Sequence, residues 1–264
     1  MKSEYLSRGK RSENYSSFKK ECAINITKQA SDVDFVNTSS KWLEQSIEHK
    51  YSYNFEFLGR PIIQYPTDIL ATLEIIFQVK PSLIIETGIA HGGSLICWAA
   101  HLCLLDLLDG ADPRNSHRKV LGIDVDLREH NRKALEQHPL KFKIDTINGS
   151  SVDTNVVEAV DTVAANAERV MVILDSNHSH EHVLKELELY SEFVSVGSYL
   201  IVFDTCIQVM PDSFFSNRPW GVDNNAMTAL KQWLPENPSF EIDSSISNKL
   251  MISVAPDGYV KRRA

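Results

Sequence analysis

Short apolar segments that end on a carboxylate are the feature that most constrains the fold of this chain. There are four of them: LII before Glu86, VLGI before Asp124, VMVIL before Asp175 and YLIVF before Asp204. Helix-like segments lie between them, and repeated βα units with apolar strands predict a parallel sheet that is covered on both faces. Ligands of open α/β sheets bind outside the carboxyl ends of the strands. Four acids at that edge therefore predict a site for ribose hydroxyls, a cation and a reacting hydroxyl.

The same alternation predicts the elements of a main domain over residues 66–264. Hydrophobic periodicity predicts helices near 69–77, 93–108, 128–137, 154–167, 180–190 and 225–233. Apolar runs predict strands at 83–85, 120–123, 142–147, 170–174, 199–203 and 250–254. Residues 1–65 are expected to form an N-terminal helical and aromatic cap that is partly flexible at its polar start.

Charge and composition exclude several classes of protein. The formal net charge of -8 disfavours a nucleic-acid partner. No apolar run is long enough to span a membrane, and the first twenty residues lack the apolar core of a signal peptide. The four cysteines have neither metal nor redox spacing. A cytoplasmic protein with reduced thiols and without a membrane partner is the simplest interpretation.

The turn after the first of these strands reads ETGIAHGGS over residues 86–94. Its glycines permit a close approach to a ligand, but the dinucleotide fingerprint G-x-G-x-x-G is absent because Ala90 stands two residues after Gly88. Glu86 also precedes the turn, where a pyrophosphate would approach. The pattern favours a ligand with a positive charge and an adenosine, such as S-adenosylmethionine. A plain tight βα turn remains the alternative.

The next two strand ends extend this interpretation. Asp124 can accept hydrogen bonds from both ribose hydroxyls, as acids at this position do in nucleotide-binding folds. Ser150 and Ser151 follow the third strand and can meet an adenine edge. An ordinary Gly-Ser turn explains the two serines equally well.

The segment after the fourth strand contains His178, His180 and His182. A zinc site is disfavoured, because residues two apart on a helix do not share a face and no His-Glu-x-x-His motif is present. Asp175 and Asp204, on neighbouring strand ends, form a better cation site, and their oxygen ligands suit Mg²⁺. A helix cap for Asp175 and an ordinary strand-end acid for Asp204 are the alternatives.

Several of these motifs together resemble the cephalosporin hydroxylase / rhamnosyl O-methyltransferase family. The resemblance rests on IIETGIAHGGS, VLGIDVDLREHNR, LDSNHSHEHV, VSVGSYLIVFDT, RPWG and VAPDGYVKR, and it runs from about Phe57 to the C-terminus. It implies an S-adenosylmethionine-dependent methyltransferase similar to macrolide-sugar O-methyltransferases, which require Mg²⁺. It also implies a Rossmann-like, doubly wound, mostly parallel seven-stranded sheet with an antiparallel last strand, in a homo-oligomer.

The resemblance further implies roles for individual residues. Asp175 and Asp204 match metal-binding aspartates, and Asp175 also borders the cofactor and the reacting atoms. His178 matches a histidine proposed as the base in one macrolide-sugar branch. Thr205 stands where the family usually has a second acid or amide, so its hydroxyl or a water would have to complete the metal site. The cofactor-binding positions implied are Glu86, Thr87, Gly88, His91, Gly92 and Ser94 around the methionine part, Asp124 at the ribose, and Ser150 and Ser151 near the adenine.

The function predicted from these residues is methyl transfer from S-adenosylmethionine to a hydroxyl of a small molecule, with Mg²⁺ assisting. A sugar or glycosylated natural product is the favoured acceptor, since vicinal hydroxyls can chelate Mg²⁺. A nicotinamide-dependent oxidoreductase and a non-catalytic cofactor-binding protein are the alternatives. The aromatic cap and the loop at 209–224 are expected to exclude water from the site.

Overall fold

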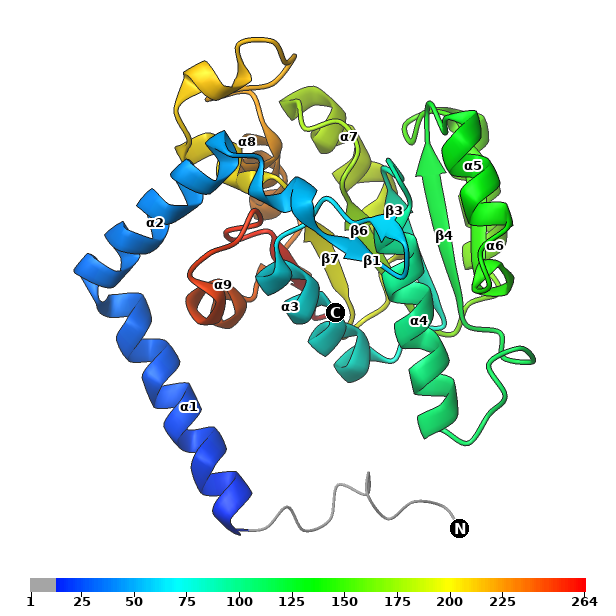
Figure 1. Cartoon of the computed structure of the whole chain (residues 1–264), viewed down its shortest axis with the longest axis horizontal. Helices are drawn as coiled ribbons and strands as arrows, with labels where there is room; N and C mark the ends of the chain where they lie inside the picture. The colour runs from blue at the N-terminus through cyan, green and yellow to red at the C-terminus, as the bar shows by residue number, and fades with distance from the viewer. Residues whose placement is uncertain (1–12) are drawn as a thin grey trace.

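A computed structural model describes residues 13–264 of the chain, which fold around one central sheet (Figure 1). The sheet has seven strands in the order β5-β4-β3-β6-β7-β9-β8. All pairings are parallel except those that β9 makes with β7 and β8. This confirms the predicted seven-stranded, mostly parallel sheet with an antiparallel last strand. The strands are β3 (Leu83–Thr87), β4 (Lys119–Asp124), β5 (Ile144–Asn148), β6 (Val170–Leu174), β7 (Tyr199–Val202), β8 (Phe240–Ile242) and β9 (Tyr259–Arg262).

Helices cover both faces of the sheet, because successive strand residues point to opposite sides. Ile84 belongs to a core cluster with residues of α3 (Pro66–Val79), α4 (Gly93–Leu108) and α9 (Ser244–Leu250). Ile85, the next residue of β3, belongs to a second cluster with α6 (Thr154–Ala164), α7 (His180–Tyr190) and α8 (Ala226–Trp233). The short α5 (Glu129–Glu136) follows β4. No helix among residues 13–264 is both long and apolar enough to cross a membrane.

The strand order reverses between β3 and β6, and this reversal decides where a ligand can bind. From β3 the chain moves outward through β4 and β5, and then returns to place β6 on the other side of β3. The connections after β3 and β6 therefore leave in opposite directions and open a crevice at the carboxyl ends of these strands. The loops that follow β3, β4, β6 and β7 surround this crevice, and they carry most of the predicted site residues.

The N-terminal segment adds two helices and a hairpin to the sheet domain. Helices α1 (Glu13–Ser31) and α2 (Val33–Glu48) follow one another at an angle on the outside of the sheet domain (Figure 1). Trp42 and Tyr51 pack edge-to-face and both contact Tyr65, which attaches α2 to the start of α3. The turn η2 (Tyr51–Asn54) and the pair β1 (Glu56–Phe57) and β2 (Arg60–Pro61) complete the segment. The flexibility predicted for the polar start of the chain falls partly on residues 1–12, which lie outside the described residues.

The predicted strand at 250–254 is wrong. Leu250 ends α9, and Met251 has a left-handed backbone with φ of 59°. The segment instead binds the buried carboxylate of Asp68 on α3, which accepts hydrogen bonds from Ser253 Oγ (2.5 Å) and Val254 N (3.0 Å). The backbone N–H of Val254 is thus hydrogen-bonded to a side chain almost two hundred residues away and not to a neighbouring strand. Its apolar residues alone therefore do not make this segment a strand. The last strands lie on either side of this segment, at β8 and β9.

Short 3₁₀ turns complete the connections. They are η3 (Lys141–Lys143), η4 (Ser191–Phe193), η5 (Thr205–Val209), η6 (Asp212–Phe215) and η7 (Leu234–Glu236). Both η5 and η6 lie in the long connection after β7, which leads to the mouth of the site.

Candidate active site

Two glycines let three segments meet at the end of β3. Gly88 has φ of +89°, and a Cβ on it would lie 2.0 Å from the backbone oxygen of Asp175. A Cβ on Gly93, in the first turn of α4, would lie 2.1 Å from the backbone oxygen of Pro61. Only glycine at these two positions allows the turn to approach both the β6 loop and strand β2 of the hairpin. The glycines therefore set the width of the crevice.

Glu86 lies beneath this turn and does not face the crevice. It is 1% exposed, and its carboxylate accepts hydrogen bonds from Ser94 Oγ and from Trp98 Nε1 (2.5 Å), both on α4. Burial raises the pKa of this carboxyl to about 7, and the two hydrogen bonds oppose the rise only partly. Glu86 thus supports the helix that opens the site and places a titratable charge behind it.

The crevice forms a first cavity of about 440 Å³, within the size range of small-molecule sites. It runs from the β3 turn across the end of β4 to the loops after β5 and β6. Seven predicted cofactor residues line it, and Glu86, Thr87 and Gly92 do not. The seven are Gly88, His91, Ser94, Asp124, Ser150, Ser151 and Asp175.

Asp124 closes the β3 turn from the neighbouring strand. Its Oδ2 accepts hydrogen bonds from the backbone N–H groups of Ile89 (2.8 Å) and Ala90 (3.1 Å), and its Oδ1 accepts one from Asp126 (2.9 Å). Oδ2 thus already accepts two hydrogen bonds, whereas Oδ1 can still accept a second one. The carboxylate is therefore held rigidly and offers Oδ1 to a hydroxyl at the cavity wall.

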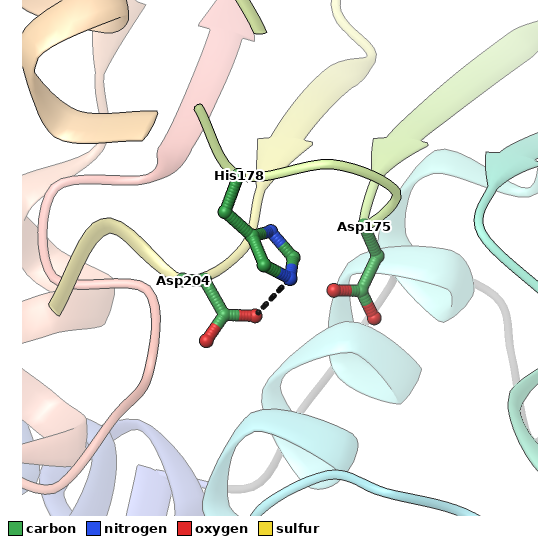
Figure 2. Close-up of side chains that lie close together, drawn as sticks. All are labelled: Asp175, His178 and Asp204. Atoms are coloured by element: carbon green, nitrogen blue, oxygen red, sulfur yellow. Dashed lines mark ion pairs between the residues drawn. The ribbon is translucent and has the colours of Figure 1, made fainter. Parts of the chain in front are cut away.

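A second cavity of about 420 Å³ adjoins the first and shares Asp175 with it. Asp175 and His178 come from the loop after β6, and Asp204 follows β7 (Figure 2). Their side chains point into one space, and ligand atoms of all three lie within 4.8 Å of one another. His178 Nε2 is 3.4 Å from Asp204 Oδ2. The imidazole packs edge-on against the Trp220 ring, with 4.8 Å between the ring centres.

The acid pair leaves Asp175 in a poor environment for a negative charge. Desolvation, then the charges of Asp204 and Glu86, raise its pKa well above the ordinary range. Gln64 Nε2 donates a hydrogen bond to Asp175 Oδ2 (2.9 Å) and opposes the rise. A cation between the two aspartates would oppose this rise of the Asp175 pKa, because an opposite charge favours the ionised form.

Gln64 was not predicted from the sequence. It is 4% exposed, lines both cavities, and its Oε1 has no hydrogen-bond partner among the described residues. A buried amide oxygen without a partner is rare in proteins and indicates a missing ligand or water. The only signal in the sequence was a polar side chain inside the apolar run PIIQYP. Other unpredicted lining residues of the first cavity include Pro61, Ile62, Ile63, Asn177, His182 and Trp220.

These donors fit a divalent cation of the Mg²⁺ type. Asp175 and Asp204 offer two carboxylates, and Mg²⁺ usually takes one or two of them while keeping several waters. Thr205 does not join the pair: it is buried, lines neither cavity, and its hydroxyl donates to the Pro256 carbonyl (2.6 Å). His178 lies instead at the third corner of the site.

The other two histidines, His180 and His182, each have partners of their own. His180 contacts Thr228 and Gln232 on α8. His182 Nε2 lies 3.1 Å from Ser151 Oγ and 3.2 Å from Ser176 Oγ. His182 therefore supports the wall of the first cavity.

Comparisons with known proteins agree with this architecture. Residues 49–263 match the family model described as Rhamnosyl O-methyltransferase/CmcI. A rhamnosyl O-methyltransferase of Mycobacterium tuberculosis (strain ATCC 25618 / H37Rv) is 28% identical over 193 residues, covering 72% of this chain and 70% of the relative. The enzyme of the same name from Mycobacterium leprae (strain TN) is 25% identical over 225 residues, covering 81% of this chain and 89% of the relative.

A solved structure described as "cmcI-D160 Mg-SAM" shares the fold. Its TM-score is 0.51 at 16% sequence identity, and the match covers 80% of this chain and 78% of that one. Since the family model covers most of the chain and the sheet has the expected topology, the family expected from the motifs is confirmed: the chain belongs to the rhamnosyl O-methyltransferase/CmcI family.

Proposed function

We propose that this protein transfers a methyl group from S-adenosylmethionine to a hydroxyl of a sugar or glycosylated small molecule, with the help of a divalent cation such as Mg²⁺. The observation that carries the proposal is the position of Asp175, which lines both cavities at their junction. Family membership, the name of the mycobacterial relatives and the Mg and SAM named for the CmcI structure support it.

The first cavity suits the cofactor along its whole length. The β3 turn, with Gly88 and Ser94, would receive the methionine part, and the backbone N–H groups at the start of α4 would face its carboxylate. Asp124 Oδ1 would accept a hydrogen bond from a ribose hydroxyl, and Ser150 and Ser151 would meet the adenine. This placement directs the sulfonium towards Asp175 and the second cavity.

The second cavity suits the acceptor and the proton transfer. A cation held by Asp175 and Asp204 would stabilise the negative charge that develops on the reacting oxygen. His178 Nε2 faces the same space and would take the hydroxyl proton while the oxygen–carbon bond forms and the carbon–sulfur bond breaks. General-base catalysis of this kind contributes typically ~10²–10⁴-fold. The remaining rate enhancement would come from alignment of oxygen, methyl carbon and sulfur.

The proposal is tested with purified protein, S-adenosylmethionine and a panel of sugars and glycosides, by following S-adenosylhomocysteine formation. Asp175→Ala and Asp204→Ala are each expected to abolish turnover, and EDTA is expected to do so in the wild type until Mg²⁺ is restored. Asp161→Ala, an exposed change on α6, is the matched control and should leave activity unchanged. Full activity of both site variants in EDTA would refute the metal role.

His178 needs a separate test, because it can act as base or as a third metal ligand. His178→Ala is expected to lower kcat by about 10²-fold or more while binding of S-adenosylmethionine, measured by calorimetry, stays the same. An unchanged kcat would remove His178 from the mechanism. Calorimetry with NAD instead of S-adenosylmethionine tests the oxidoreductase alternative, for which no binding is expected.

We also propose that the chain forms a homo-oligomer through its N-terminal helices. Apolar side chains are exposed on α1 and α2, where a second copy would cover them: Phe18, Ile24, Val33, Phe35 and Val36. Light scattering of the full chain, and of a variant with Phe18, Val33 and Phe35 changed to Ser, would show whether this surface assembles.

A further inference from the structure

The mouth of the second cavity is positively charged, although the chain as a whole is acidic. The acids that line this cavity are Asp175 and Asp204, both at its floor. Lys50 and Arg218 line it as well, and both side chains are exposed to solvent. They come from segments far apart in sequence, the junction between α2 and η2 and the connection that follows η6. Two exposed cations therefore line a cavity whose other charged side chains are acidic.

Neither cation has an acidic partner within the part of the chain that the structure describes. No salt bridge or side-chain hydrogen bond involves Lys50 or Arg218 there, whereas Lys80, Arg118 and Arg132 each bind a carboxylate at 2.7 Å or less. Lys50 and Arg218 lack such a partner because no carboxylate lines the mouth of the cavity beside them. The two positive charges are thus free to bind an anion from solution.

Arg218 is held against the wall of the cavity. Its guanidinium lies 5.4 Å from the centre of the Trp220 ring, and Trp220 in turn meets His178 edge-on. A guanidinium stacked on an aromatic ring is partly preorganised and keeps its N–H donors available, which suits two-point binding of a phosphate or carboxylate. Lys50 has a left-handed backbone with φ of 52°, at the bend that turns α2 towards the cavity.

The second cavity also has aromatic walls. Tyr53, Phe214, Phe215 and Trp220 line it. Flat apolar faces of this kind pack against the C–H faces of a sugar ring or against a base. An acceptor of the right shape would place one hydroxyl at the floor, its ring between the aromatic side chains and an anionic group at the mouth.

We propose that the acceptor is a phosphate-bearing sugar, held with its reacting hydroxyl at Asp175 and Asp204 and its phosphate between Lys50 and Arg218. With a divalent cation on the two aspartates the floor becomes close to neutral, so that the mouth carries the net positive charge of the cavity. The phosphate can belong to a sugar phosphate or to a nucleoside-diphosphate sugar, since both present the same group beside the ring. This inference rests on the proposed function and narrows its substrate class.

The test compares rhamnose and glucose in three forms: the free sugar, its 1-phosphate and its nucleoside-diphosphate conjugate. For the wild type, KM of a phosphorylated form is expected to be at least tenfold below that of the free sugar. Arg218→Gln and Lys50→Gln are each expected to raise that KM about tenfold with little change in kcat, because each removes a charge-assisted contact that is equal in ground and transition state. Lys231→Gln, an exposed cation of α8 outside the cavity, should have no effect.

A difference between the two phosphorylated forms distinguishes a sugar phosphate from a nucleotide-linked sugar. Equal kcat/KM for free and phosphorylated sugars, or Arg218→Gln and Lys50→Gln variants that match Lys231→Gln, would overturn the inference while leaving methyl transfer intact. If no sugar is methylated, calorimetry of the S-adenosylhomocysteine complex with each sugar 1-phosphate still decides: binding weakened about tenfold by Arg218→Gln supports the inference, and absence of binding overturns it. Failure of S-adenosylmethionine itself to bind would instead refute the proposed function.

Discussion

Burial of Glu86 beneath the β3 turn predicts an unusual pH dependence of stability. The pKa of this carboxyl is about 7 in the folded protein, against 4.5 for an ordinary glutamate. Because the folded-state pKa is raised, the folded state binds this proton more tightly than the unfolded state does. Its stabilising contribution is full below pH 4.5 and is lost as pH rises through 7. Between pH 5 and pH 8 the loss of stability attributable to Glu86 is about 2–3 kcal/mol, since one pKa unit corresponds to about 1.4 kcal/mol.

Glu86→Gln isolates this contribution. A glutamine amide can accept the hydrogen bond from Trp98 Nε1 and donate one to Ser94 Oγ, so that the contacts with α4 are kept without a titratable group. Unfolding by urea, followed by tryptophan fluorescence without cofactor or metal, would be measured at pH 5, 6, 7 and 8. The free energy of unfolding of the variant, relative to wild type, is expected to rise by about 2–3 kcal/mol over this range.

The comparison between the two proteins matters more than the wild-type trend, because Asp68 is also buried and its pKa is raised to about 6. That group contributes equally to wild type and variant. Glu158→Gln, an exposed change on α6, should follow the wild-type curve. Parallel curves for Glu86→Gln and wild type would show that Glu86 titrates near its ordinary pKa, and the assignment of a buried charge behind the cofactor turn would fail.

Three further changes test the packing around the site. Gly88→Ala should raise the Kd of S-adenosylmethionine by about 100-fold or more in calorimetry, because its Cβ would overlap the backbone oxygen of Asp175; unchanged affinity would contradict the close approach. Gln64→Leu should lower kcat about tenfold with the fold intact by circular dichroism, since it removes the hydrogen bond to Asp175 and the free amide oxygen. Asp68→Ala should lower the urea unfolding free energy by about 3 kcal/mol, because it leaves three buried donors unpaired; a loss below about 1 kcal/mol would argue against this network.

The sequence predicted the central strands because each contains a run of buried apolar residues, and because β3, β4 and β6 are each followed by a helix. The predicted position of Glu86 at the edge of the sheet was wrong, because a difference of one residue along a strand turns a side chain to the other face of the sheet. β3 continues through Thr87, so Glu86 is not the terminal residue, and it points with Ile84 towards α4 rather than over the edge. At β4 the acid is the last strand residue, and Asp124 reaches the cavity as expected.

Other features were invisible to periodicity because they depend on contacts between distant residues. Gln64 follows a two-stranded hairpin, and only the fold brings it beside Asp175. The binding of residues 253 and 254 to Asp68 replaced the strand predicted there. Both features involve a buried polar side chain whose partner lies more than one hundred residues away.

The backbone geometry after β7 explains why the proposed metal site is not formed by two adjacent residues. Asp204 has a left-handed backbone with φ of 57°, which costs roughly 1–2 kcal/mol for a residue other than glycine. This bend turns its carboxylate towards His178, while the next residue, Thr205, is directed into the core and is held by the Pro256 carbonyl. The side chains of these two successive residues thus point in different directions, and Thr205 packs in the core away from the proposed cation site. His178, from the β6 loop, lies at the third corner, so the proposed cation site and the proposed base would face the same cavity.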